Sequence, residues 1–211
     1  MGYIATVRLW RHGTVVAYEK FDVAHLERLN DESRFESLPP EVMWRALGDP
    51  NPRTIIDIGA GTGLFSCRFA ELAPSAEVYA VDIEPSMVRW MLEHRPMHLC
   101  ERLHPLLGRE AVVPLGTGEA DLAVMINLHH ELVDPHASYR EALRVLRIGG
   151  QLLVADWAPG GEGERPPQHV RASSELIAET LSALGFESIT SHPGLPSHSL
   201  LTARKPAVCG I

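Results

Sequence analysis

A glycine-rich turn that directly follows a short apolar run constrains the fold of this chain more than any other feature. Residues 54–58 form a β-branched run, which is typical of a strand buried on both faces. Gly59, Gly61 and Gly63 follow, and residues 64–72 have a helical pattern. In doubly wound α/β sheets, ligands bind where a strand end meets a helix start, because glycine lets the backbone approach closely. The sequence therefore predicts an α/β fold with a ligand site at this turn.

The spacing of the glycines narrows the choice of ligand. A dinucleotide fingerprint needs a third glycine where this chain has Leu64, and Asp57 would repel a pyrophosphate but could hold a cationic amine. A phosphate-binding P-loop needs a lysine, and no lysine lies between positions 20 and 205. Asp82 ends the next predicted strand, 21 residues after Gly61, where an acid can accept both hydroxyls of a ribose.

Strand and helix patterns alternate along the rest of the chain. We expect further strands at residues 77–81, 121–126 and 151–156, and helices at 64–72, 85–93 and 135–146, the last ended by Gly149-Gly150. The tail predicts a helix at 173–184 and two strands, 187–191 and 199–204, whose short connection favours an antiparallel hairpin. Helical patterns also occur at 21–29 and 41–47. We therefore divide the chain into an N-terminal helical segment (1–50), a main domain (51–205) and a tail (206–211).

Composition excludes several classes of partner. The net charge is −8, which argues against a grip on nucleic-acid backbones. Three scattered cysteines fit a reducing compartment better than a disulfide framework. We find neither a signal peptide nor an apolar stretch near the roughly 20 residues of a membrane helix. We expect a cytoplasmic protein that binds neither membrane nor nucleic acid.

Three segments resemble class I S-adenosylmethionine-dependent methyltransferases: residues 57–63, residues 78–87, and the Arg-Val-Leu-Arg-Ile-Gly-Gly run at 144–150. The resemblance covers about residues 20–205. It is greatest to small enzymes of the methyltransferase-11 type, relatives of the ubiquinone and menaquinone C-methyltransferases. It implies a doubly wound, Rossmann-like sheet of seven strands in the order 3-2-1-4-5-7-6, with strand 7 antiparallel and helices on both faces.

The resemblance also implies a set of residues that bind S-adenosylmethionine. Asp57 and the glycine backbone would hold the methionine part, Asp82 the ribose hydroxyls, and Asn127 would line the methionine end. Ile83 and Met87 would pack near the adenine. The full set is Asp57, Gly59, Ala60, Gly61, Gly63, Asp82, Ile83, Met87 and Asn127.

Candidate catalytic residues lie just past the ends of two predicted strands. Methyl transfer from a sulfonium is an in-line displacement, for which the protein orients the reactants and, for some acceptors, removes a proton. We expect His130, Glu131 and Asp156 to act on the acceptor, beside His129 and Trp157. The alternative is structural, with Glu131 and Asp134 capping the helix that starts near Pro135 and Trp157 closing a strand end. A helix from Phe21 and the loop at 160–163 are candidate lids.

Four further residues, His94, His98, Cys100 and His104, form a cluster without a recognisable zinc spacing, and we expect no metal there. Trp90 between Met87 and Met91 is expected in the core. The sequence thus predicts a methyltransferase for a small-molecule acceptor. The alternatives are a non-catalytic module that binds S-adenosylmethionine or S-adenosylhomocysteine, a methyltransferase for a macromolecule, and an NAD-dependent oxidoreductase, which the missing glycine disfavours.

Overall fold

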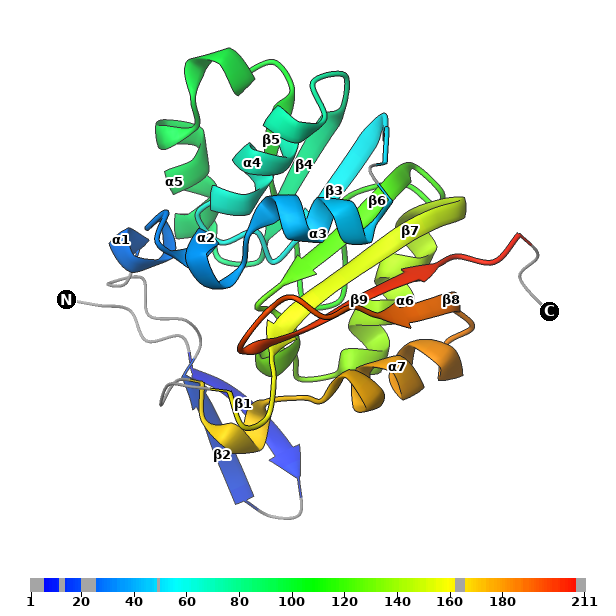
Figure 1. The fold of residues 1–211 in the computed structure, drawn as a ribbon. Helices are drawn as coiled ribbons and strands as arrows, with labels where there is room; N and C mark the ends of the chain where they lie inside the picture. The colour runs from blue at the N-terminus through cyan, green and yellow to red at the C-terminus, as the bar shows by residue number, and fades with distance from the viewer. Residues whose placement is uncertain (1–5, 12–13, 20–25, 49, 162–165, 208–211) are drawn as a thin grey trace.

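The computed structural model describes residues 6–11, 14–19, 26–48, 50–161 and 166–207. Its main sheet has seven strands in the order β5-β4-β3-β6-β7-β9-β8 (Figure 1). They are β3 (Thr54–Ile58), β4 (Glu77–Asp82), β5 (Leu103–Leu107), β6 (Ala120–Ile126), β7 (Leu146–Trp157), β8 (Glu187–Ser191) and β9 (His198–Arg204). Counted along the chain within this sheet, the order is 3-2-1-4-5-7-6, so the predicted topology is confirmed.

Strand direction brings the predicted site residues to one edge of the sheet. β3 pairs in parallel with β4 and β6, β4 with β5, and β6 with β7, whereas β9 runs antiparallel to both β7 and β8. In the register of β3, Asp57 lies opposite Ala80 on one side and Val124 on the other. The carboxyl ends of β3, β4, β6 and β7 therefore meet at the same edge, as ligand sites in this architecture require.

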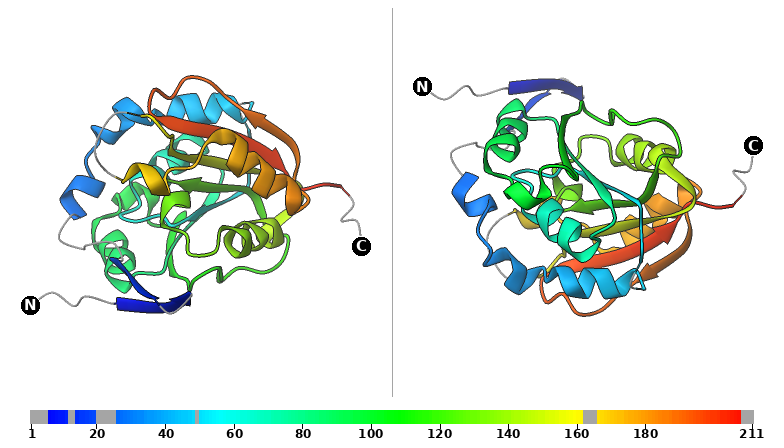
Figure 2. Two further views of the ribbon diagram at one scale, coloured as in Figure 1. Left: turned by 90° about the horizontal axis from the view of Figure 1, so that it is seen from below. Right: turned by 90° about the horizontal axis from the view of Figure 1, so that it is seen from above.

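Helices cover both faces of the sheet, and each face has its own apolar core (Figures 1 and 2). On one face lie α3 (Pro40–Ala46), α4 (Leu64–Leu72) and α5 (Pro85–His94), and on the other α6 (Pro135–Val145) and α7 (Ser174–Ala183). Local sequence explains where these helices begin. Proline occupies the first turn of α3, α5 and α6, and the side chains of Asp134 and Ser173 accept backbone N–H groups at the starts of α6 and α7.

The structure differs from the sequence-based expectations at two strands. β5 carries Pro105 and was not predicted; as an edge strand it tolerates the missing N–H, because one of its sides needs no ladder partner. We also expected Gly149-Gly150 to end the preceding helix. Instead α6 ends at Val145 and β7 starts at Leu146, so both glycines lie inside this twelve-residue strand, with Gly149 at a φ of 72°.

The N-terminal part contains a hairpin that the sequence did not predict. β1 (Thr6–Arg11) pairs antiparallel with β2 (Thr14–Glu19), and α1 (Leu26–Leu29) and α2 (Arg34–Ser37) follow. The helix expected from Phe21 is described only from Leu26 on, and its first residues lie outside the described part, as do residues 162–163 of the second candidate lid. The three-part division of the chain stays a prediction. Within the described residues, no helix is long and apolar enough to cross a membrane.

Candidate functional site

The glycine loop after β3 is held in place by the neighbouring strand. Gly59 and Ala60 both donate their backbone N–H groups to the carbonyl of Val81, at 2.8 and 3.0 Å. Gly59 has a φ of 76°, and a Cβ on this residue would lie 2.6 Å from a methyl carbon of Leu128. A side chain is thus disfavoured by the backbone conformation and would require Leu128 to shift. Gly63, at a φ of 80°, precedes the first residue of α4.

Asp82 ends β4 and faces the loop. Its Oδ2 accepts the N–H of Gly61 at 2.7 Å, and its Oδ1 accepts the N–H of Glu84 at 2.9 Å. Burial raises the pKa of Asp82, although these two backbone hydrogen bonds oppose the shift. Since each carboxylate oxygen can accept two hydrogen bonds, Asp82 keeps one acceptor position on each oxygen for a pair of hydroxyls.

Asp57 is a buried carboxyl beneath the same loop, only 2% exposed. Burial raises its pKa to about 7, and a 2.6 Å hydrogen bond from the Ser66 hydroxyl works in the opposite direction. The charge of Asp82 adds to the rise, whereas that of Arg34 opposes it. Asp57 therefore lacks a compensating positive charge strong enough to keep it fully ionised at neutral pH.

The other predicted cofactor residues occupy different environments. Asn127 follows β6 with a φ of 52°, and its side-chain oxygen is buried without a hydrogen-bond partner. Ile83 is 38% exposed just after β4, where a ligand can contact it. Met87 is buried on α5. The structure therefore places Asn127 and Ile83 at the strand ends and Met87 in the protein interior.

His130 and Asp156 form a close pair across the ends of β6 and β7. His130 Nδ1 lies 2.8 Å from Asp156 Oδ1, and Asp156 also accepts the backbone N–H groups of His129 and Trp157, at 2.7 and 2.8 Å. Asp156 is fully buried and His130 nearly so. Because a carboxylate only accepts, Nδ1 of His130 carries the hydrogen and Nε2 offers a lone pair. Burial lowers the pKa of His130, but the hydrogen bond and charge of Asp156 outweigh it and raise the pKa overall.

Glu131 and His129 complete the short 3₁₀ turn η3 (His129–Glu131) in different ways. Glu131 Oε1 lies 3.7 Å from His130 Nε2, and burial raises the pKa of Glu131. His129 Nδ1 lies 2.7 Å from the hydroxyl of Tyr139 on α6, which ties that ring to the fold. Of the two residues expected to cap the next helix, Asp134 does so, since its Oδ1 accepts the N–H of Ala137 at 3.0 Å. His129 is therefore tied to α6, whereas His130 is tied to Asp156 at the strand ends.

Two side chains that the sequence did not single out belong to this region. Arg34 on α2 donates to the carbonyl of Leu29 at 2.7 Å and lies 5.0 Å above the ring of Phe65. Burial lowers the pKa of Arg34 to about 10, so it remains a cation at neutral pH, and its charge acts on both Asp57 and Glu131. His198 packs its ring on Trp157 with centroids 4.1 Å apart, and both of its buried ring nitrogens lack a partner. Neither position shows a motif, so only the fold reveals them.

The three histidines and one cysteine that lie close together in the sequence between positions 94 and 104 contact different partners in the fold. His104 pairs with Glu77 at 2.6 Å, His94 stacks on Trp90, and His98 lies 3.9 Å from Glu71. Cys100 contacts the carbonyl of Pro96. No group of three or more metal-ligating side chains converges among the residues that the structure describes.

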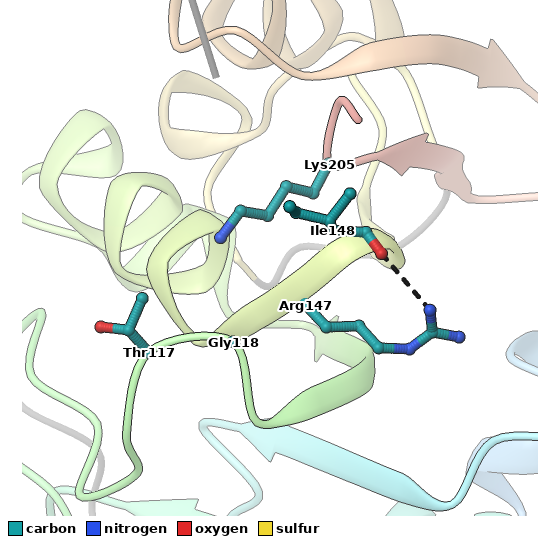
Figure 3. Close-up of a pocket in the computed structure, with 5 residues that line it drawn as sticks. All are labelled: Thr117, Gly118, Arg147, Ile148 and Lys205. Carbon is teal, nitrogen blue, oxygen red and sulfur yellow. Dashed lines mark hydrogen bonds between the residues drawn. The ribbon is translucent and has the colours of Figure 1, made fainter. Parts of the chain in front are cut away.

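A surface hollow lies away from these groups. An open depression of about 590 Å³ is lined by Thr117, Gly118, Arg147, Ile148 and Lys205 (Figure 3). It sits at the opposite end of β6 and β7 from His130 and Asp156. The Lys205 ammonium donates to the carbonyls of Arg144 and Leu146, at 3.5 and 2.7 Å, where α6 ends. Lys205 thus satisfies carbonyl groups that the end of a helix leaves open.

A seven-stranded sheet of this order, with an acid-flanked glycine loop and an acid at the end of the next strand, defines a class I methyltransferase domain. A family model described as "Methyltransferase domain" matches residues 51–194. The chain belongs to this family, the S-adenosylmethionine-dependent methyltransferases, and the resemblance seen in the sequence is confirmed.

Individual relatives agree with this assignment. The chain is 34% identical, over 83% of its length and 66% of the relative's, to the malonyl-[acyl-carrier protein] O-methyltransferase of Methylococcus capsulatus. It is 30% identical, over 50% of its length and 45% of the relative's, to the demethylmenaquinone methyltransferase of Chlamydia pneumoniae. A crystal structure of a SAM dependent methyltransferase from Aquifex aeolicus has the same fold, with a TM-score of 0.81, 24% identity, and coverage of 88% of this chain and 99% of that one. The chain spans less than two thirds of the length of the two curated relatives.

The residues present fit S-adenosylmethionine. The unpartnered oxygen of Asn127 can accept a hydrogen bond from an ammonium group, and Asp82 keeps acceptor positions for two hydroxyls. A ligand cation beside Asp57 would compensate the charge of its carboxylate. The positive charge of Arg34 interacts with the same carboxylate and lowers its pKa. One anionic and one cationic side chain suit the two charges of an amino-acid group.

Proposed function

We propose that this protein transfers a methyl group from S-adenosylmethionine to the hydroxyl oxygen of a small acceptor, with His130 as the general base. The observation that carries the proposal is the His130–Asp156 pair. The fully buried Asp156 accepts Nδ1–H of His130 at 2.8 Å and so leaves Nε2 to take a proton. A histidine held in one tautomer by a carboxylate suits proton removal near neutral pH.

The remaining groups are assigned to binding. Asp57, Asp82, Asn127 and the backbone of the glycine loop would hold the cofactor, with Arg34 opposite its carboxylate. When bound, the cofactor supplies a methyl group already activated on a sulfonium. His130 removes the hydroxyl proton as the oxygen attacks, and Asp156 stabilises the imidazolium that results. Trp157 and His198 would form a wall of the acceptor site, since their rings pack against each other at the end of β7 and the start of β9.

A screen of small hydroxylated acceptors with labelled S-adenosylmethionine tests this proposal. The matched variant is His130→Asn, whose amide can keep the hydrogen bond to Asp156 while it removes Nε2. We expect a loss of about 10²- to 10⁴-fold in kcat, with an unchanged affinity for S-adenosylhomocysteine. If wild type binds S-adenosylhomocysteine but transfers no methyl group to any acceptor, the non-catalytic cofactor module becomes the better description.

A carboxylate acceptor is a second candidate, and the name of the Methylococcus relative favours it. A carboxylate needs no base, and His130, with its raised pKa, would then bind it as an imidazolium. The two candidates predict opposite pH dependences. A general base makes kcat/KM rise with pH through the pKa of His130, whereas an imidazolium that binds the acceptor makes it fall.

We also propose that the protein acts in the cytoplasm. The described cysteines Cys67 and Cys100 are free thiols, as expected in a reducing compartment. Fractionation of the native host, with detection by antibody, tests this.

A further inference from the structure

A buried cation, Arg171, lies beside the proposed acceptor site. It directly follows the short 3₁₀ turn η4 (Gln168–Val170) and is only 6% exposed. Burying a guanidinium is costly unless hydrogen bonds and favourable charges compensate for the lost water. The contacts that compensate this cost therefore identify what Arg171 holds in place.

Arg171 donates hydrogen bonds to both described ends of the loop that follows β7. Its Nη1 donates to the carbonyl of Gly161 at 2.7 Å, and its Nε donates to the carbonyl of Pro166 at 2.9 Å. Gln168 strengthens this attachment, because its Oε1 accepts the N–H of Gly160 at 3.0 Å. A single planar guanidinium thus joins the start of this loop to its end.

The same guanidinium contacts the ring of Trp157. Its central carbon lies 5.4 Å from the ring centre, which is within the range of a cation–π contact. Trp157 packs in turn against His198, with ring centroids 4.1 Å apart, and its backbone N–H donates to Asp156 at 2.8 Å. Since Asp156 also holds His130, a continuous series of contacts runs from Arg171 through Trp157 to His130.

Arg171 also places a positive charge near both histidines of this region. Burial lowers the pKa of His198 to about 4, and the charge of Arg171 adds to this shift. For His130, burial and the charge of Arg171 lower the pKa, although Asp156 raises it overall. Replacing Arg171 would therefore change the electrostatics of the site as well as its packing.

We propose that Arg171 is a positioning residue for methyl transfer, which fixes the ring of Trp157, and through it His198, as the wall against which the acceptor binds. This role rests on the proposed function, because it needs an acceptor at the ends of β6 and β7. Two hydrogen bonds and a cation–π contact from one rigid group restrict where the indole can lie. An acceptor then meets a wall that is already in place, so that less ordering opposes its binding.

Three variants separate positioning from stability. Arg171→Met removes the charge and the donors but keeps an unbranched side chain, whereas Arg171→Lys keeps the charge and loses the planar fork. Arg102→Lys is the matched control. Arg102 also donates to backbone carbonyls, those of Ala70, Ala73 and Ala76, but it precedes β5 at the opposite edge of the sheet.

Steady-state kinetics with the acceptor found in the screen give the first result. Arg171→Met should lower kcat/KM for the acceptor about 10²-fold, mainly by raising KM, because the wall contacts the acceptor before and during transfer. Arg171→Lys should lose only about tenfold, since the charge remains. The affinity for S-adenosylhomocysteine should not change. The role is overturned if Arg171→Met leaves the acceptor KM unchanged, or if Arg102→Lys raises it equally.

A second measurement does not depend on turnover. In the full chain labelled with ¹⁵N at tryptophan, the indole N–H signal of Trp157, assigned with Trp157→Phe, should shift in Arg171→Met and stay in place in Arg102→Lys. The signals of Trp44 and Trp90 should not move in Arg171→Met. If the wild type methylates no acceptor although the Trp157 signal shifts, the proposed function fails and the positioning of Trp157 stands. If acceptors are methylated but the Trp157 signal does not shift, only the role of Arg171 is overturned.

Discussion

Proton release from Asp57 should control the affinity of this protein for its cofactor. Burial raises the pKa of this carboxyl to about 7, so that in the free protein about half of the molecules carry a neutral Asp57 at that pH. An ammonium group bound beside Asp57 favours the ionised form. Binding is therefore coupled to proton release, and S-adenosylhomocysteine should bind more tightly as the pH rises through 7.

The size of the effect follows from the same pKa. If the bound ligand lowers the pKa of Asp57 to 5 or below, the affinity between pH 6 and 8 scales with the ionised fraction in the free protein. That fraction is about one eleventh at pH 6 and ten elevenths at pH 8, so affinity should rise about tenfold between them. The rise should be centred near pH 7, far from the usual range of an aspartate. Ser66→Ala removes a hydrogen bond that stabilises the ionised form, and should move the centre to higher pH.

Isothermal titration with S-adenosylhomocysteine between pH 5.5 and 8.5, in buffers of different ionisation enthalpy, measures both affinity and proton release. Asp57→Asn should bind more weakly at pH 8 and lose the dependence centred near pH 7. The pKa of His130 is raised above that of a free imidazole, and its cationic form would repel the ligand's ammonium, so His130→Asn is the control and should retain the dependence. A wild-type affinity that stays flat from pH 6 to 8, or a dependence that disappears in His130→Asn instead, would refute the reasoning about Asp57.

Three further predictions concern stability and positioning. Gly59→Ala should destabilise the fold by about 1–3 kcal/mol in urea unfolding, because its Cβ would lie 2.6 Å from a methyl carbon of Leu128. If adding Leu128→Ala restores none of the lost stability, this explanation is wrong. Lys205→Met should cost about 1–3 kcal/mol in the same assay, since it removes the donor to the carbonyls of Arg144 and Leu146, and should leave the affinity for S-adenosylhomocysteine unchanged. Asp156→Asn should lower kcat about 10²- to 10⁴-fold, because its amide no longer fixes the tautomer of His130, and should change cofactor affinity much less; equal losses in both would indicate a purely structural role.

Local sequence predicted the elements that their own residues determine. The bounds of β3, α4 and β8 agree with the expected ones, because glycine, proline or polar residues limit each of these segments in the sequence. β5 was not predicted because Pro105 interrupts its pattern of apolar residues. A proline is acceptable in an edge strand, but only the complete sheet shows that β5 lies at an edge. The hairpin of β1 and β2 shows only a loose alternation of apolar residues.

The candidate residues were proposed one by one from the sequence, but the contacts between them were not predicted. His130 and Asp156 were separate candidates on two strand ends, 26 residues apart, and the 2.8 Å contact between them depends on the register of β6 with β7. Arg34 could not be predicted, since nothing in residues 30–37 marks a ligand contact. Its position over Phe65 results from how α2 packs against α4. Sequence patterns thus identify the residue types at strand ends, whereas the side chains that reach in from elsewhere depend on packing.

The carboxyls at the strand ends argue for a working cofactor site. Burial raises the pKa values of Asp57, Asp82 and Glu131, so each is less readily ionised in this fold than in water. The pKa of Asp57 is near 4 in the unfolded chain and near 7 in the folded protein. Between these two pH values the folded state binds one more proton than the unfolded state. The free energy of unfolding therefore falls as the pH rises through this window, by about 4 kcal/mol at most. Asp57→Asn should therefore raise the melting temperature of the free protein more at pH 8 than at pH 5. A chain that only needed to fold would be more stable with an amide at this position. The carboxyl lowers stability at neutral pH, and a bound cation reverses that cost, so its presence is best explained by a cationic ligand that the protein binds.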